Sequence, residues 1–300
     1  EPMNATALYT PDKCEVWVPT QNGEASFAAA VAASGLPSDK VEVYKIDLGG
    51  GFGRRGAFQD YVTQAVLIAK QMPGTPVKLL WTREEDMLRG RYHPVMQAKL
   101  VGALDANNNL TGLHIRLSGQ SILASAIPHM LDKGKDNLTF QGFWPAGDFA
   151  FGYSIPNLLI DHSMRNPHIL PGFWRGVNIN QNCIFVECFM DELAKTAGQD
   201  PLAFRRKLMD KHPKHLAVLN AVAAKIGWDK PAPNGVYRGL AQMKSFASYV
   251  AAAAEISVSD GGNKIKIHRI VAATDPIHAV NPAQIERQGS GAFVYGLSAL

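Results

Sequence analysis

The spacing of apolar and polar residues predicts an alternation of strands and helices over the first third of the chain. Apolar or β-branched residues alternate with polar ones in segments 14–21 and 41–48, as expected of strands with one buried face. The Ala-rich segment 23–36 and the apolar-periodic segment 60–72 are typical of helices, and the first has a glycine at its end. Residues 75–86, TPVKLLWTREED, are predicted to form the next strand.

The middle of the chain departs from this alternation. Residues 97–119 contain two strand-like runs on either side of Asn107-Asn108-Asn109, which predicts a hairpin. Residues from 124 to 153 contain Gly, Pro, Trp and Phe without a period, so we predict a long loop region there. The whole succession predicts an α+β (mixed α/β) fold.

The last part of the chain is predicted to hold helices, a linker and paired strands. Asp200 is expected to cap a helix that has Pro201 at its first position. The linker 228–235, WDKPAPNG, is the candidate domain boundary. The other predicted elements are helices 180–198 and 215–227, strands 239–259 and 264–275 joined at Asp260-Gly261-Gly262, and a last helix opened by Asn281-Pro282.

Composition narrows the class of protein. Three hundred residues suggest two packed units, and 46% apolar with 19% charged residues is ordinary for a soluble globular enzyme. The net charge is +4, but Lys and Arg are scattered along the chain, so no nucleic-acid partner is expected. No apolar run is long enough to span a bilayer. The opening EPMNATALYT lacks the regions of a signal peptide and resembles the interior of a domain.

The cysteines limit the redox chemistry that the chain can hold. There are three, Cys14, Cys183 and Cys188, whereas the common iron–sulfur clusters need four thiolate ligands. An odd number also argues against a pure disulfide framework. We expect all three to behave as small buried hydrophobic residues.

The most distinctive stretch is LGGGFGRRG, residues 48–56, between a predicted strand and a predicted helix. Gly51, Gly53 and Gly56 satisfy G-x-G-x-x-G, the pattern of dinucleotide-binding loops, which would make the protein a nicotinamide-dependent dehydrogenase. That interpretation needs an acidic residue about twenty positions further on, and the nearest acids begin at Glu84. A glycine-rich turn without a ligand, in a non-catalytic binding domain, is a second interpretation. A third is a flat backbone that admits a planar anionic cofactor beside Phe52.

A family resemblance favours the third interpretation. LGGGFGRR, WTREEDM, GFWRGVNINQN, CFMDELA and VNPAQIE…GLSAL together resemble the molybdenum-binding large subunit of the xanthine oxidase family, in its isoquinoline 1-oxidoreductase and membrane-bound aldehyde dehydrogenase branch. The resemblance implies a molybdopterin-binding fold in two units, incomplete at both ends. Residues 1–231 would form the first cofactor-binding domain, and 236–300 the start of the second.

The resemblance also implies a chemistry and its partners. The parent protein would hydroxylate an aldehyde or an N-heterocycle with oxygen derived from water. Its cofactor would be molybdenum–molybdopterin in the cytosine dinucleotide form. Electrons would pass to [2Fe-2S] clusters on a small partner subunit, and a cytochrome c is a candidate acceptor. The family resemblance favours a periplasmic or membrane-associated location.

The residues that the resemblance assigns to the cofactor lie in three places, and no side chain is assigned as a metal ligand. They are Gly50, Gly51, Phe52, Gly53 and Arg54 in the loop, Arg175 in FWRG, and Gln288, Gly289 and Gly291 near the pterin tail. A backbone N–H of the loop would donate to an oxygen of the metal, and a guanidinium would bind an anionic group. Without the resemblance, Phe52 is a packed loop aromatic, and the arginines are structural ion-pair partners.

Two departures from the family pattern bear on the substrate, and one on catalysis. Xanthine-oxidising members carry a glutamate where this chain has Gly56, and an arginine directly before His-Pro where it has Tyr92. Purine recognition is therefore not expected. The family's catalytic glutamate lies in a G-x-G-E motif that this sequence lacks, so we expect a fragment without a catalytic residue of its own, inactive in isolation.

Overall fold

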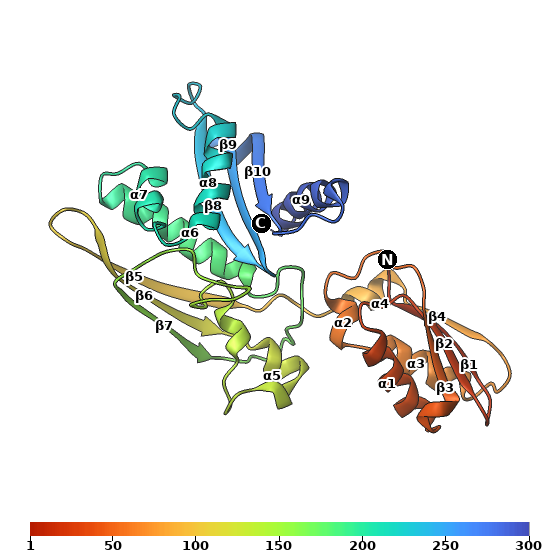
Figure 1. Ribbon diagram of the computed structural model, residues 1–300. Helices are drawn as coiled ribbons and strands as arrows, with labels where there is room; N and C mark the ends of the chain where they lie inside the picture. Colours follow the sequence, from red (N-terminus) through yellow and green to blue (C-terminus); the bar gives the residue numbers. More distant parts are fainter. Residues whose placement is uncertain (300) are drawn as a thin grey trace. The chain divides into compact units, whose positions relative to one another are not determined.

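The computed structural model describes residues 1–299, which divide into two compact units (Figure 1). The chain passes between the units several times, so neither unit is a continuous half of the sequence. The first unit comprises Glu1–Met96, Ser118–Thr139 and Met164–Val177, and the second comprises Gln97–Leu117, Phe140–Ser163 and the chain from Asn178 onward.

The first unit is a four-stranded sheet covered by helices. The strands are β1 (Asn4–Tyr9), β2 (Cys14–Val18), β3 (Val41–Lys45) and β4 (Val77–Leu80), in the order β3-β2-β1-β4. β2 and β3 are parallel, and β1 is antiparallel to both β2 and β4. Helix α1 (Gly23–Ser34) connects the parallel pair, and α3 (Asp60–Ala69) packs on β1 and α1. The core lies between this sheet and the two helices.

Two sequence predictions in the first unit need correction. Strand β1 was missed because its inward residues, Ala5 and Ala7, are so small that the alternation of side chains is weak. The predicted strand 75–86 ends at Leu80, and its second half is helix α4 (Arg83–Leu88). The hydroxyl of Thr82 accepts a hydrogen bond from the Glu85 amide, which caps that helix and stops the strand.

The second unit holds two three-stranded sheets and most of the helices. Its first sheet has the order β5-β6-β7, and the hairpin turn is built on Asp105, whose carboxylate accepts hydrogen bonds from the amides of Asn107 and Asn109. This confirms the predicted hairpin. The strands are β5 (Met96–Leu104), β6 (Leu110–Gly119) and β7 (Asn157–Met164).

The second sheet of this unit has the order β10-β9-β8 and carries helix α8 on one face. The predicted single strand 239–259 is wrong, because it folds back at Phe246-Ala247, where both residues have positive φ (46° and 62°). Such turns normally contain Asn or Gly, so nothing in the sequence marked this one. The strands are β8 (Tyr237–Ser245), β9 (Ser248–Ser259) and β10 (Lys264–Asp275).

The helices of the second unit begin where their capping residues predicted. Asp200 accepts a hydrogen bond from the Ala203 amide, and Asn281 accepts one from the Gln284 amide. The helices are α6 (Ile179–Thr196), α7 (Pro201–Lys207), α8 (Pro213–Ile226) and α9 (Pro282–Leu297).

The region predicted as a long loop contains only short helical pieces. Asp136, which is buried, accepts hydrogen bonds from the Ser121 hydroxyl and from the Leu123 and Leu138 amides, and so anchors this region. The pieces are α5 (Ile122–Ala126) and the 3₁₀ turns Pro128–Met130 and Asn137–Phe140. The remaining short helical elements, outside this region, are α2 (Arg54–Ala57) and the 3₁₀ turns Ser38–Lys40 and Asp260–Gly262.

The mixed α/β fold class is confirmed, whereas the boundary between cofactor-binding domains at 231–236 stays a prediction. The compact units do not divide there, because α8 packs on β9 and β10 across the linker. Arg238 and Arg269 share the carboxylate of Glu255, and their guanidinium groups also donate to carbonyls at the C-terminal end of α8 and in the linker. These arginines join the two sides of the linker.

The cysteines differ more than the sequence suggested. Cys14 is buried, but Cys188 is exposed and Cys183 half-buried, so the prediction of three buried thiols is wrong for α6. Five positions on a helix turn the side chain by about 140°, which places the two on different faces. Burial raises the pKa of each thiol. None of the helices among residues 1–299 has the length and apolar content to cross a membrane.

Candidate functional site

The glycine loop at residues 48–56 follows β3 and leads into the short helix α2. Gly50 and Gly53 have φ of +103° and +96°, which favours glycine. Phe52 also has a positive φ, +53°, although it is bulky, and 47% of its surface is exposed. A Cβ added at Gly50 would lie 2.6 Å from the Phe52 ring, so the ring lies against that glycine. A strained, half-exposed aromatic residue is characteristic of functional loops.

The loop contacts the segment that carries Arg175, from a distant part of the sequence. A Cβ added at Gly53 would lie 2.2 Å from the carbonyl oxygen of Phe173, so only glycine fits. Phe173 lies two positions before Arg175 in the sequence. The structure thus places the predicted residue Gly53 against the segment that carries Arg175, which is half-buried. Both belong to the first unit.

The Arg175 segment is held on its other side by residues 92–93. The amide of Gly172 donates to the Tyr92 carbonyl (3.0 Å), and the His93 ring packs edge-on against Trp174, with centroids 5.1 Å apart. Nε2 of His93 lies 3.2 Å from the Val177 carbonyl. Val177 has φ of +51°, which is strained for a β-branched residue, and it bends the chain just after Arg175.

Gln21 is a further candidate residue at the glycine loop that the sequence reasoning missed. Its Oε1 accepts a hydrogen bond from the Gly53 amide (2.9 Å), and its side chain covers Gly51, because a Cβ there would lie 2.4 Å away. A signal was available. Gln21 follows β2, the loop follows β3, and the carboxyl ends of parallel strands lie side by side.

Arg55 anchors the loop from inside the protein. It is fully buried, and its guanidinium donates to the carbonyls of Pro19 (2.7 Å) and Pro2 (2.8 Å). The amide of Gln21 donates to the Arg55 carbonyl (3.2 Å). One residue therefore joins the beginning of the chain, the end of β2 and the loop.

Glu1 adds a negative charge beside the loop. Its carboxylate accepts hydrogen bonds from the Gly49 amide (2.6 Å) and the Asn4 side chain, and it lies 3.3 Å from the Arg55 guanidinium. Partial burial acts to raise the pKa of Glu1, but the hydrogen bonds from Asn4 and Gly49 and the charge of Arg55 outweigh it and lower the pKa. Glu1 is therefore an ionised partner of the anchor.

Arg54, one of the predicted cofactor residues, is engaged within the protein. Its guanidinium pairs with both carboxylate oxygens of Asp60 (2.8 and 2.9 Å) and donates to the Phe58 carbonyl. This geometry favours the structural alternative that the sequence left open. A contact between Arg54 and the cofactor stays a prediction.

The loop still offers hydrogen-bond donors to a ligand. The amides of Gly49 and Gly53 have acceptors within the protein, whereas those of Gly50 and Gly51 have none in the described part of the chain. Gln21 uses its Oε1 for the loop, and its amide nitrogen makes no bond to the described residues. These three donors suit an electronegative oxygen, so the site fits the group that the resemblance implies.

The dinucleotide interpretation fits less well. A pyrophosphate-binding loop needs a helix that starts at the glycines and points its N-terminus at the ligand. Here α2 is only four residues long, and the extended backbone of Phe58 separates it from α3. The loop resembles a dinucleotide fingerprint in spacing but not in structure.

The remaining predicted cofactor residues lie in the second unit. Gln288, Gly289 and Gly291 are on α9, with Gln288 exposed and the two glycines half-buried. Their contact with the pterin tail stays a prediction. Among residues 1–299, no group of three or more His, Cys, Asp or Glu side chains could hold a metal ion.

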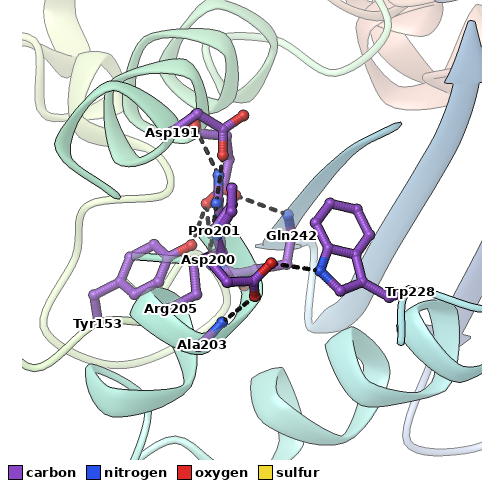
Figure 2. A network of polar contacts seen from close by, with 9 residues as sticks. Tyr153, Asp191, Asp200, Pro201, Ala203, Arg205, Trp228 and Gln242 are labelled. Carbon is purple, nitrogen blue, oxygen red and sulfur yellow. Dashed lines mark hydrogen bonds and ion pairs between the residues drawn. The ribbon is translucent and has the colours of Figure 1, made fainter. Parts of the chain in front are cut away.

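The second unit also contains a buried polar network, which Figure 2 shows from close by. The Glu187 carboxylate accepts bonds from Arg205 (3.0 Å), from the Tyr153 hydroxyl (2.6 Å), and from the backbone and side chain of Gln242. Arg205 also pairs with Asp191 (2.6 Å). Burial opposes the charge of Arg205, but its acidic neighbours outweigh this and raise its pKa above the usual range. The network is satisfied internally and is structural.

A shallow cleft of about 660 Å³ lies beside that network, between α7, α8 and the linker. Its polar groups bond to one another: Asp200 accepts from the Trp228 indole (2.9 Å, Figure 2), and Arg206 donates to Asn220 (2.8 Å). The cleft therefore offers less to a ligand than the glycine loop does.

Comparison with known proteins identifies the family of the chain. The model of the molybdopterin cofactor-binding domain matches residues 1–209. The chain is 27% identical to the isoquinoline 1-oxidoreductase subunit beta of Brevundimonas diminuta, over 99% of this chain and 38% of that protein. It is 26% identical to a membrane-bound aldehyde dehydrogenase [pyrroloquinoline-quinone] of Gluconacetobacter polyoxogenes, over 99% of this chain and 41% of that protein.

A solved structure confirms the fold. Quinoline 2-oxidoreductase from Pseudomonas putida 86 superposes with a TM-score of 0.65 and 18% identity, over 84% of this chain and 34% of that one. The chain thus spans well under half the length of the relatives that it matches.

Proposed function

The chain belongs to the family of molybdopterin cofactor-binding domains, and from this membership we propose that it is part of the catalytic subunit of a molybdenum hydroxylase of the xanthine oxidase type. The observation that supports this most is the glycine loop. It joins strained backbone, an exposed aromatic residue and unused amide donors, and it contacts the segment of Arg175.

The residues of the first unit would act on the cofactor by binding and orienting it. The amides of Gly50 and Gly51 and the side-chain amide of Gln21 would donate to an oxygen of the metal centre. They are fixed before binding by Arg55, so little reorganisation is needed. Arg175 would bind an anionic part of the pterin, and Phe52 would border the reacting carbon. The cofactor, when bound, supplies the oxidising metal for hydroxylation with oxygen from water.

The substrate that we propose is an aldehyde or an N-heterocycle. Relatives named for isoquinoline and for aldehyde oxidation support this class. Gly56 and Tyr92, which replace the purine-binding residues of the resemblance, support it further. We assign no catalytic base among the described residues.

The finer points of cofactor and partners belong to the same proposal. The cofactor is molybdopterin cytosine dinucleotide, and the [2Fe-2S] clusters lie on a small partner subunit, with a cytochrome c as a candidate acceptor. The name of one relative as a subunit supports a multi-subunit assembly, and the three cysteines of this chain are consistent with clusters held elsewhere. We propose a periplasmic or membrane-associated location for the parent protein.

Metal and nucleotide analysis of the intact parent protein, purified with its partner subunit, tests this function. We expect molybdenum and cytosine nucleotide in amounts close to one per chain. Active enzyme that contains neither would overturn the proposal, and binding of a nicotinamide nucleotide with a change in its fluorescence would support the dehydrogenase alternative.

A further inference from the structure

Arg91 differs from the arginines that precede it in the glycine loop and in α4 because it has no carboxylate partner among residues 1–299. Four arginines between residues 54 and 89 each form an ion pair: Arg54 with Asp60, Arg55 with Glu1, Arg83 with Asp86 and Arg89 with Glu85. The Arg91 guanidinium makes neither an ion pair nor a hydrogen bond to residues 1–299. Arg91 is nevertheless half-buried, so water solvates its charge only in part.

The position of Arg91 is fixed by packing. Its guanidinium lies over the Phe58 ring, 4.2 Å from the centroid. A Cβ added at Gly172 would lie 2.6 Å from the Arg91 side chain and 3.0 Å from the Phe58 ring, so all three are in close contact. Phe173, the next residue, contacts Gly53 of the loop. Arg91 is thus held beside the candidate cofactor site.

The surroundings of Arg91 leave its positive charge uncompensated. Burial lowers its pKa, and the nearby charge of Arg54 lowers it further, against a smaller opposite effect of Asp60. Asp60 is already engaged by Arg54 at 2.8 Å. A partly desolvated cation without a counter-ion is costly, which an anionic ligand would remedy.

We propose that Arg91 binds the carboxylate of an aromatic substrate beside the glycine loop. A guanidinium presents two parallel N–H donors that match the two oxygens of a carboxylate. Contact with the Phe58 ring, 4.2 Å from its centroid, holds the guanidinium in place before a ligand binds. The proposal rests on the proposed function, because it concerns the substrate of that same site.

The neighbouring apolar surface favours an aromatic ring as the rest of the ligand. Tyr92 and Leu170 are each 53% exposed, and the Tyr92 amide donates to the Leu170 carbonyl, which places the two residues side by side. Val95, three residues after Tyr92, is 62% exposed. A cation next to exposed apolar side chains suits a ligand with one charged end and one apolar end.

The experiment measures binding of benzoate and of its neutral analogue benzamide to the intact holoenzyme by calorimetry. Arg91→Ala should weaken benzoate binding about ten- to hundredfold and leave benzamide binding unchanged. Arg91→Lys, which keeps the charge and loses the fork, should weaken benzoate less. Arg89→Ala is the matched control, because Arg89 is exposed and its side chain pairs with Glu85; it should change neither.

A second measurement needs no variant. Phenylglyoxal modifies accessible arginines, and peptide mass spectrometry reports the extent at each one. Benzoate should protect Arg91 from modification, and benzamide should not. Modification of Arg89 should be the same with either ligand.

Three results would overturn the proposal. They are a wild-type holoenzyme that does not bind benzoate, an Arg91→Ala enzyme that binds it as tightly as wild type, and an Arg91→Ala protein that loses molybdenum as well, which would assign the guanidinium to a phosphate of the cofactor. The molybdenum content of the wild-type protein is measured in parallel. If it is absent, the proposed function fails, whatever the benzoate result.

Discussion

Two fully buried arginines, one in each unit, show what separates a structural network from a candidate site. Arg205 in the second unit uses Nε and both terminal nitrogens on Glu187, Asp191 and backbone carbonyls. Arg55 in the first unit bonds to the carbonyls of Pro2 and Pro19 and to Glu1, but its buried Nε has no partner among the described residues, and neither does Nε of Arg54.

The difference extends to the surroundings of each arginine. No member of the Arg205 network has a positive φ, and its core around Glu187 is buried, although the Asp191 side chain at its edge is 45% exposed. Arg55, in contrast, supports a loop with Phe52 in a strained conformation and two amides without acceptors among the described residues. A network that satisfies itself stabilises a fold. A network that leaves hydrogen-bonding groups without partners, beside strained backbone, is a candidate for binding a ligand.

The largest effect should come from removing Arg205 from its buried network in the second unit. Arg205→Ala would leave the Glu187 carboxylate buried without its counter-ion, and it should lower the free energy of unfolding by about 3–5 kcal/mol. Urea denaturation measures this. Arg206→Ala is the control, because that side chain is exposed and, among the described residues, bonds only to Asn220; its effect should stay below about 0.5 kcal/mol. Equal effects of the two would mean that the network is not structural.

The next effect concerns the close approach at the loop. Gly53→Ala would combine a positive φ with a clash against the Phe173 carbonyl, and it should cost about 1–3 kcal/mol and lower molybdenum content. Gly56→Ala is the matched control in the same loop. Its Cβ would meet nothing within 4 Å, and alanine suits a helix better than glycine, so it should be neutral or slightly stabilising. Gly53→Val, with its larger side chain, should lose the cofactor altogether. Full molybdenum loading in that variant would argue against a cofactor at this loop.

A dependence of stability on pH should come from the second unit, where His215 contacts Gln242 of the Arg205 network. His215 is buried, with Nδ1 2.6 Å from Gln242 Oε1, and burial lowers its pKa from 6.5 despite this hydrogen bond. Burial also lowers the pKa of His212. The folded state favours the neutral form of His215. The stability that this group contributes is therefore complete above pH 6.5, and it is lost as the pH falls towards the lowered pKa of the folded state.

Stability of the wild-type protein should therefore decrease between neutral and mildly acidic pH. His215→Gln should flatten that decrease, and His278→Gln, at an exposed position, should leave it unchanged. Unfolding curves at a series of pH values measure both. An unaltered slope in His215→Gln would show that other groups cause the acid sensitivity.

The smallest effect should come from Gln21. Gln21→Ala removes the acceptor of the Gly53 amide and should cost about 1 kcal/mol of stability. Gln21→Glu keeps an acceptor but removes the amide donor, so it should retain stability and lose cofactor binding. If both variants bind molybdenum normally, the donor role proposed for Gln21 is wrong.

Local signals predicted most elements of the fold. The caps at Asp200 and Asn281 and the turn at Asn107–Asn109 act through neighbouring residues, so the sequence contains them completely. The errors arose where the signal is weak. The small residues of β1 give little alternation, and the turn at Phe246-Ala247 has the conformation of a glycine turn without the glycine.

The site divides in the same way. The sequence by itself determined the glycine loop and, through the arrangement of its motifs, the family, because these depend on residues close together in the chain. Only the tertiary structure decided that Gly53 contacts Phe173, that Gln21 covers the loop, and that Arg91 lies over Phe58 with no carboxylate partner among the described residues. These facts depend on contacts between segments far apart in sequence, which strand pairing and packing bring together and local pattern does not record.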